Sequence, residues 1–565
     1  MTKNLPAIDQ LSLDEKIGQL FVPEGHGVFL NEGAAPYRRL ERFVREQHVG
    51  GIIWFASNVL ETAMLNRRLQ AGARVPLLIS ADLEAGMGMR FADTTFWPSA
   101  MAVAATGEPR LAEAEGREVA IEARAVGVNH ILAPVADVNV DPDNPVINTR
   151  SYGEDPQSVA RFVAAFIEGV QSEHVLATAK HFPGHGDTHV DSHRSLPVLD
   201  VTPERLEAIE LVPFRSAISA GVRSIMIGHL GVPSIDPTHA PLRADGLREN
   251  RYVTGSVESA EHSTIPATLS RPIVTGVLRG RLGYDGLVVS DAFDMGGLTE
   301  HFDAGEAAVR GIEAGMDQIM FSANTDAAIA AVKAAVASGR LPAARVDESV
   351  RRILAAKAFA SYDVAEDEEI LRVVDSERSR RVAREIAAKA LTLLREAPGV
   401  LPLQKSARVA ILAVTDFADL VNPMAELERE LRLRLANAPR MVAVDARSSD
   451  AEVGAAVEAS RTADVVVVAL AIRARSGAGR LAVPPAAKRG IEQMIAGPVP
   501  VIGISFGSPY VIREAPKVPT YLCAYAPVPV MCEAAARALF GEAPMGGRLP
   551  VTIPALFDRG AGIDR

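Results

Sequence analysis

Short apolar runs alternate with longer helix-patterned stretches through the first 325 residues. Consecutive apolar positions predict strands buried on both faces, and the alanine-rich stretches between them, such as 108–127 and 203–221, have helical spacing. Eight such alternations predict an α/β fold, a (β/α)8 TIM-like barrel. The first run could instead belong to a leading helix, since residues 12–21 read as a capped helix start. The runs are 17–22, 50–56, 76–82, 130–138, 175–182, 223–230, 285–291 and 317–322.

A second domain follows the barrel. Residues 325–396 are mostly helical in pattern, and the Pro/Gly stretch 397–403 forms a joint. A second αβ alternation then has apolar runs at 407–414, 439–446, 463–472, 499–507 and 519–526. We therefore expect a catalytic barrel over 1–380, a helical linker and joint over 381–403, and a smaller αβα three-layer sandwich over 404–565. Residues 244–263 are polar and aperiodic, which predicts an inserted loop near the sixth strand.

Composition narrows the class of protein. The formal net charge of the 565 residues is −11, which argues against a general nucleic-acid binder. The two cysteines, Cys523 and Cys532, cannot build a disulfide framework and are expected to be buried thiols. No run is apolar and long enough to predict a membrane span, and the first residues do not read as a signal peptide. We expect a cytoplasmic protein without membrane or nucleic-acid partners.

Four of the twelve histidines recur at every fourth residue in "KHFPGHGDTHVDSH", residues 180–193. On a helix this spacing would stack the imidazoles of His181, His185, His189 and His193 as in a metal site. Proline and two glycines at 183, 184 and 186 oppose a helix, so the spacing favours a loop and no metal site. A buried strand precedes this loop, and α/β enzymes place their chemistry where strands end.

Other strand ends carry polar residues too. Asp82, Lys180, His181, His229 and Asp291 each follow or close an apolar run. A charged group there costs free energy unless it is paired or used, so any one could be a structural ion pair. Their concentration at one end of one barrel favours an active site.

Two motifs carry a family resemblance. The stretches 180–193 and 266–295, "PATLSRPIVTGVLRGRLGYDGLVVSDAFDM", resemble glycoside hydrolase family 3 over about residues 10–360. The similarity is strongest to the bacterial β-N-acetylglucosaminidase branch, which uses an Asp-His dyad and includes β-glycoside phosphorylases. The wider family often carries an αβα second domain, which agrees with the pattern above.

The resemblance implies a retaining mechanism, in which a carboxylate nucleophile and an acid/base lie about 5 Å apart across the glycosidic bond. Asp291 occupies the nucleophile position, and Asp294 is the rival carboxylate. His193 would be the acid/base, oriented by Asp191, because an imidazole exchanges protons near neutrality. His185 remains without a role. No cofactor or metal is required.

The resemblance also implies a set of sugar-binding residues: Asp82, Arg90, Arg150, Lys180 and His181. One departure is visible. Where the family usually reads Asp-Gln-Glu-Gly-Gly-Arg, residues 82–87 read Asp-Leu-Glu-Ala-Gly-Met. The lost polar groups put fine sugar specificity in doubt, so both β-GlcNAc and β-glucoside substrates stay open.

The second domain lacks the glutamate that serves related β-glucosidases as acid/base. The comparable stretch "ARSGAGRLAVPP" contains none, so the dyad would have to act. The loop instead carries Arg473, Arg475 and Arg480, which are either solvated or a phosphate site. The leading hypothesis is a retaining β-N-acetylglucosaminidase or β-glucosidase. A phosphorylase using the same intermediate is the alternative, and a zinc hydrolase and an inactive sugar-binding protein are the rivals.

Overall fold

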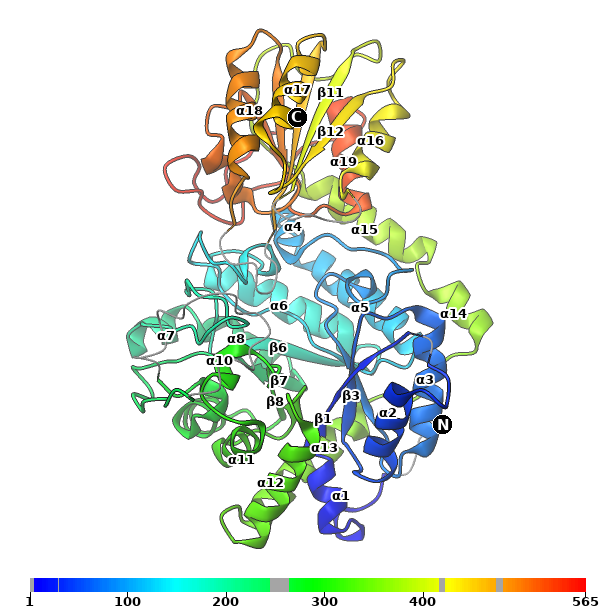
Figure 1. Cartoon of the computed structure of the whole chain (residues 1–565), viewed down its shortest axis with the longest axis vertical. Helices are drawn as coiled ribbons and strands as arrows, with labels where there is room; N and C mark the ends of the chain where they lie inside the picture. Colours follow the sequence, from blue (N-terminus) through cyan, green and yellow to red (C-terminus); the bar gives the residue numbers. More distant parts are fainter. Residues whose placement is uncertain (1–4, 29, 244–263, 416–421, 474–480) are drawn as a thin grey trace. The chain divides into compact units, whose positions relative to one another are not determined.

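The computed structural model describes residues 5–28, 30–243, 264–415, 422–473 and 481–565. It divides into two compact units (Figure 1). The first contains residues 1–95, 112–138 and 156–379, and the second contains 96–111, 139–155 and 380–565. The predicted loop at 244–263 lies outside the described residues, as do Arg475 and Arg480.

The first unit is a ring of parallel strands. Neighbours pair in the order β2–β3–β4–β5–β6–β7–β8. The ring closes because β9 pairs with β1, Val289 at the end of β8 bridges to Gln318, and Gly50 before β3 donates its N–H to Phe21. The predicted TIM-like barrel is thereby confirmed. The strands are β1 (Phe21–Val22), β2 (Glu24–His26), β3 (Gly51–Phe55), β4 (Leu78–Ala81), β5 (His130–Ile131), β6 (Leu176–Phe182), β7 (Ser224–Ile227), β8 (Leu287–Ser290) and β9 (Ile319–Met320).

The prediction of a first strand over 17–22 was wrong for most of its length. Residues 13–18 form helix α1 (Leu13–Gly18), which begins with the expected capping box. Ser12 accepts the N–H of Glu15, and Glu15 in turn accepts the N–H of Ser12 at 2.8 Å. The strand starts only at Phe21 and is divided by Pro23, which has no N–H to donate to a sheet.

Helices alternate with these strands, and side chains at their first turns explain several of the boundaries. Asn58, Asp303 and Asn324 each accept a backbone N–H at the start of the helix that follows. The helical segments are α2 (Ala35–Arg45), α3 (Val59–Gly72), α5 (Pro109–Ala125), α6 (Pro156–Gln171), α7 (Pro203–Ala208), α8 (Leu211–Ser219), the π-helix η6 (Pro272–Arg281), α10 (Gly296–Thr299), α11 (Ala304–Ala314), α12 (Thr325–Ala337), α13 (Ala343–Phe359) and α14 (Asp367–Val373).

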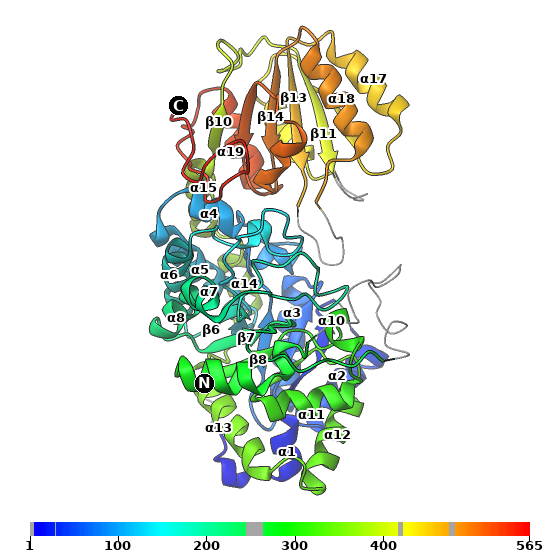
Figure 2. The same ribbon diagram turned by 90° about the vertical axis from the view of Figure 1, so that its left-hand side faces the viewer.

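The second unit is a six-stranded sheet between helices. Its strand order is β10–β15–β14–β13–β11–β12, parallel except for the edge strand β10 (Figure 2). Helices α17 and α18 cover one face, and α16 and α19 cover the other (Figure 1). The bounds are β10 (Thr392–Arg395), β11 (Val409–Thr415), β12 (Arg440–Val444), β13 (Val465–Ala471), β14 (Val501–Ser505), β15 (Thr520–Cys523), α4 (Ala100–Ala105), α15 (Glu377–Ala390), α16 (Ala425–Arg432), α17 (Asp450–Ser460), α18 (Pro485–Ala496) and α19 (Pro529–Leu539).

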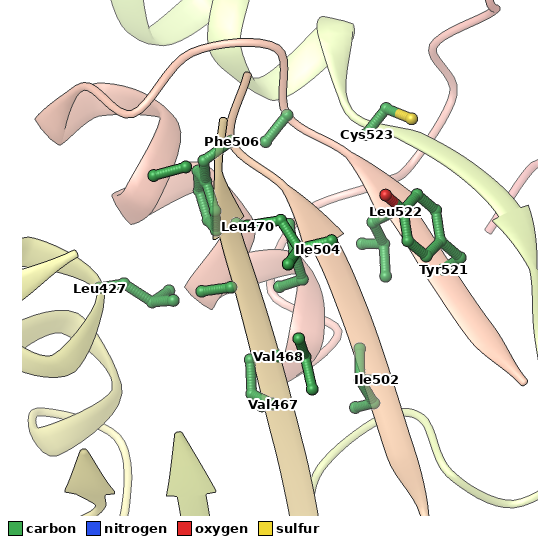
Figure 3. Close-up of a cluster of buried hydrophobic side chains, with 14 of the residues drawn as sticks. Leu427, Val467, Val468, Leu470, Ile502, Ile504, Phe506, Tyr521, Leu522 and Cys523 are labelled. Carbon is green, nitrogen blue, oxygen red and sulfur yellow. The ribbon is translucent and has the colours of Figure 1, made fainter. Parts of the chain in front are cut away.

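The core of this second unit is apolar on both faces of the sheet. Val467, Leu470 and Ile504 lie among its fully buried side chains (Figure 3). Such two-sided burial is what a parallel sheet covered by helices requires, and it confirms the predicted sandwich. Both cysteines are free and buried, as expected. Among the described residues, no helix combines the length and the apolar character needed to cross a membrane.

Candidate active site

A buried lysine joins two acidic side chains at the carboxyl ends of the barrel strands. Lys180 lies near the end of β6, with 2% of its side chain exposed. Its Nζ donates to Oδ1 of Asp82 at 2.8 Å and lies 2.6 Å from Oε1 of Glu84. Arg90 donates to the other oxygen of Asp82 at 2.6 Å. Three of the predicted sugar-binding residues therefore form one hydrogen-bonded group.

The charges in this group determine the state of Asp82. Burial alone would raise the pKa of its carboxyl, but the positive charges of Lys180 and Arg90 outweigh burial and hold that pKa well below its ordinary value. Glu84 was not predicted as a site residue. Its signal was present in the sequence as a second acidic residue two positions after Asp82, in a segment otherwise apolar.

His181 is paired with an aspartate that the sequence reasoning missed. Asp137 is fully buried, and its Oδ2 accepts from Nδ1 of His181 at 2.7 Å. The same carboxylate accepts the backbone N–H of His181 and, at 2.7 Å, that of His185. An acidic residue within the apolar run 130–138 was the available signal, because a buried carboxylate requires partners.

The histidine-rich loop contains no helix between Pro183 and Ser195, as its prolines and glycines predicted. Its histidines therefore do not stack. Nδ1 of His193 lies 2.9 Å from Oδ1 of Asp191, and Oδ1 also accepts the N–H of His193 at 2.9 Å. His185 is buried and bonds within the loop, to Thr188 at 2.7 Å. Among the described residues, no three His, Cys, Asp or Glu side chains converge to hold a metal.

Asp291 follows β8 and is half-buried. Burial raises the pKa of its carboxyl, but the charges of His181 and His229, the N–H of Ala292 and the charge of His193 together lower it below its ordinary value. Asp291 is thus ionised near neutrality, and three histidines lie within electrostatic reach of it. The structure therefore brings Asp291, His181 and His193 together, as the strand-end argument expected.

His229 supports the peptide that follows Asp291. Its Nε2–H donates to the carbonyl of Ala292 at 3.0 Å, so Nδ1, 2.9 Å from Oγ1 of Thr268, is the acceptor in the neutral ring. Burial lowers the pKa of this fully buried imidazole, which favours that neutral form. The N–H of Ala292 in turn donates to Oδ1 of Asp291 at 2.8 Å.

The remaining predicted residues are placed elsewhere. Arg150 ends the short helix η3 (Asn148–Arg150), in a segment that belongs to the second unit, and it donates to the carbonyl of Val146. Asp294 lies in the turn before α10, three residues beyond the strand-end position of Asp291. Arg473 is exposed just after β13, while Arg475 and Arg480 lie outside the described residues.

This arrangement suits displacement at a saturated carbon. It offers one ionised carboxylate as a nucleophile, one Asp-His pair that can give and take a proton, and a separate charged group able to bind hydroxyls. The side chain of His193 is more exposed than that of His181, 19% against 6%, so it can exchange its proton with a bound molecule or water.

Comparison with known proteins agrees with this chemistry. The pattern of the glycosyl hydrolase family 3 N-terminal domain matches residues 12–356, and that of the family's C-terminal domain matches residues 391–560. A β-N-acetylglucosaminidase/β-glucosidase of Cellulomonas fimi is 31% identical over 553 residues, 96% of this chain and 94% of the relative.

Solved structures of similar proteins cover both units. A family 3 β-N-acetylglucosaminidase from Paenibacillus sp. FPU-7 superimposes with a TM-score of 0.82 at 33% identity, covering 96% of this chain and 99% of that one. The β-glucoside phosphorylase BglX bound to 2FGlc has a TM-score of 0.82 at 27% identity, covering 97% and 95%.

Proposed function

Because the chain belongs to glycosyl hydrolase family 3, we propose that it is a retaining, exo-acting β-glycosidase whose nucleophile is Asp291 and whose acid/base is His193. The observation that carries the proposal is the placement of an ionised Asp291 within electrostatic reach of a histidine that is itself held by Asp191. Asp291 would attack the anomeric carbon and form a glycosyl-enzyme while His193 protonates the departing oxygen. In the second step His193 would accept the proton of the incoming nucleophile.

Asp191 gives His193 the geometry that this role needs. Nδ1–H donates to the buried carboxylate, which leaves Nε2 as the atom that exchanges protons with the substrate. The carboxylate also stabilises the imidazolium that forms when His193 accepts a proton. Neither step requires a metal or a cofactor.

β-N-Acetylglucosaminides and β-glucosides are the proposed substrates. The names of the Cellulomonas and Paenibacillus relatives support them, and the Asp82, Glu84, Arg90 and Lys180 group is suited to sugar hydroxyls. Leu83 and Met87 are both fully buried, so the departures from the family motif at these positions face the interior of the barrel unit. We therefore propose that the sugar is selected by the charged group around Lys180. The cytoplasmic location remains a prediction.

Phosphate is the second candidate acceptor. The deprotonated form of a histidine acid/base is neutral, so it does not repel an incoming phosphate dianion as a glutamate would. The similarity to a β-glucoside phosphorylase favours the same possibility. Arg473 remains a candidate phosphate ligand from the sequence alone.

One experiment tests both acceptors. The 4-nitrophenyl β-N-acetylglucosaminide and β-glucoside are incubated with and without millimolar phosphate, and the sugar products are identified by NMR. Hydrolysis predicts the free sugar, released first as the β-anomer. Phosphorolysis predicts faster turnover with phosphate and a β-sugar 1-phosphate. An α-configured first product in either case would contradict retention.

A further inference from the structure

We propose that Asp137 is a positioning residue, which holds His181 in its charged form beside the nucleophile. This inference rests on the function proposed above and deepens it. It gives the site two Asp-His pairs with different tasks: Asp191–His193 exchanges a proton, whereas Asp137–His181 supplies a lasting positive charge.

The contacts of Asp137 support this role. Its carboxylate is completely buried, and burying an ionised carboxylate costs several kcal/mol unless it is paired. Nδ1 of His181, 2.7 Å from Oδ2, is its ionisable partner among the hydrogen bonds described above. The charged form of His181 thus offsets the cost of burying Asp137, and the pair is most stable when both members are ionised.

The position of His181 transmits that charge to the reaction. The side chain is 6% exposed, and Gly228 at the end of β7 lies so close that a Cβ there would be 3.0 Å from Cβ of His181. The ring is therefore confined, with Nδ1 toward Asp137 and Nε2 on the opposite edge. An Nε2–H there can donate to a sugar hydroxyl or to a nearby carboxylate.

Four titratable groups face His181 from the surrounding elements. Asp137 follows β5, Asp291 follows β8, His229 follows β7, and His185 lies in the loop after β6 with its ring centroid 6.0 Å away. Of these, the two carboxylates favour a charged His181 and the two histidines oppose it. Among the charges that lower the pKa of Asp291, that of His181 contributes most.

Asp137→Asn separates this charge from a simple hydrogen bond. The asparagine oxygen can still accept the backbone N–H groups of His181 and His185. Its NH2 group, however, donates to Nδ1, which keeps the imidazole neutral with its proton on Nε2. The donor toward the sugar is retained and the charge is lost. A role limited to holding the loop or donating to a hydroxyl therefore predicts no electrostatic effect.

The measurement is the pH dependence of trapping by a 2,4-dinitrophenyl 2-deoxy-2-fluoro-β-glucoside. The leaving group needs no protonation, so the rate of labelling follows the ionisation of the nucleophile rather than the state of His193. We expect Asp137→Asn to move the acid midpoint of labelling upward by about 0.5 to 1 pH unit and to slow trapping correspondingly at pH 5. The matched control is Asp236→Asn, a buried aspartate bonded to Ser270 at 2.6 Å, which should leave the midpoint unchanged.

Further variants keep the test decisive. His181→Gln should raise the midpoint by a similar amount, and adding Asp137→Asn to it should produce no further shift, because Asp137 acts through His181. An unchanged midpoint in a folded Asp137→Asn protein, or additive shifts in the double variant, would overturn the inference. If Asp137→Asn does not fold, the midpoint of His181→Gln alone decides. Failure of the wild-type protein to be labelled at Asp291 would instead refute the proposed function.

Discussion

Nδ1 of His193 lies 2.9 Å from Oδ1 of Asp191, two residues earlier in a loop without helical structure. The same carboxylate oxygen accepts the backbone N–H of His193 at 2.9 Å. Because one buried oxygen holds both the ring and the backbone of the histidine, the imidazole has little freedom to turn. This local pair explains how an irregular loop can present an oriented proton donor.

His193→Ala should slow poor and good leaving groups unequally. With an alkyl or sugar leaving group, loss of the acid should lower kcat/KM by about 10²- to 10⁴-fold, whereas a dinitrophenyl glycoside should lose much less. Asp191→Asn should act in the same direction. A Brønsted plot over a series of aryl glycosides measures the difference, and equal losses across the series would argue against His193 as the acid.

Asp291→Ala should abolish turnover, lowering kcat by several orders of magnitude while the protein remains folded. The carboxylate is needed to form the covalent bond, so the 2-fluoro sugar should label Asp291 in the wild-type protein and nothing in the variant. Peptide mass spectrometry locates the label. The matched variant is Asp294→Ala, which should retain labelling; a label on Asp294 itself would reverse the assignment.

Lys180→Met should impair both binding and stability. It leaves the side chains of Asp82 and Glu84 together without their shared cation, and breaking a buried ion pair costs about 3 kcal/mol. KM should rise, and the thermal midpoint should fall. Lys333→Met, which removes a partly exposed pair with Asp14, is the control and should change neither quantity measurably. Unaltered KM in Lys180→Met would exclude this group from sugar binding.

Glu122→Gln should stabilise the protein increasingly as pH rises. Burial, reinforced by the charges of Asp375 and Glu118, raises the pKa of Glu122 from 4.5 to about 7 in the folded state. Its protonated form is therefore favoured by folding, and the associated stability is present below pH 4.5 and lost as pH rises toward 7. The loss amounts to about 3 kcal/mol by pH 8, and the glutamine avoids it.

Thermal unfolding at pH 4.5 and pH 8 tests the sign for Glu122→Gln. The control Glu113→Gln alters a more exposed glutamate on the same helix, paired with Arg117, and should keep the pH dependence of the wild-type protein. A Glu122→Gln variant with the wild-type pH dependence would show that this carboxyl does not titrate in the expected range.

Exhaustive chelation should leave glycosidase activity unchanged. The proposed chemistry uses only carboxylates and imidazoles, and the four histidines of 180–193 are separated by the loop: His181 bonds Asp137, His185 bonds Thr188, His193 bonds Asp191, and His189 is exposed. Activity assays before and after dialysis against a chelator measure this. Loss of activity that zinc restores would revive the metal hypothesis.

The sequence by itself determined the barrel and most of its active edge. Apolar runs buried on both faces identify parallel strands, and the first polar residue after such a run must lie at the carboxyl edge of the sheet. That local rule was enough for Asp82, Lys180, His181 and Asp291. The Asp191–His193 pair is also local, since two residues of loop suffice to bring the carboxylate to the ring.

Only the tertiary structure decided the partners that come from distant segments. Glu84 binds Lys180 across 96 intervening positions of chain numbering (180 − 84) and Asp137 binds His181 across 44, and neither pairing follows from local pattern. Strand β10 was predicted within a helical linker because its partner β15 lies about 130 residues away, and antiparallel pairing between them makes it a strand. Periodicity records which face of an element is buried, but hydrogen bonds between distant elements form only when folding brings them together.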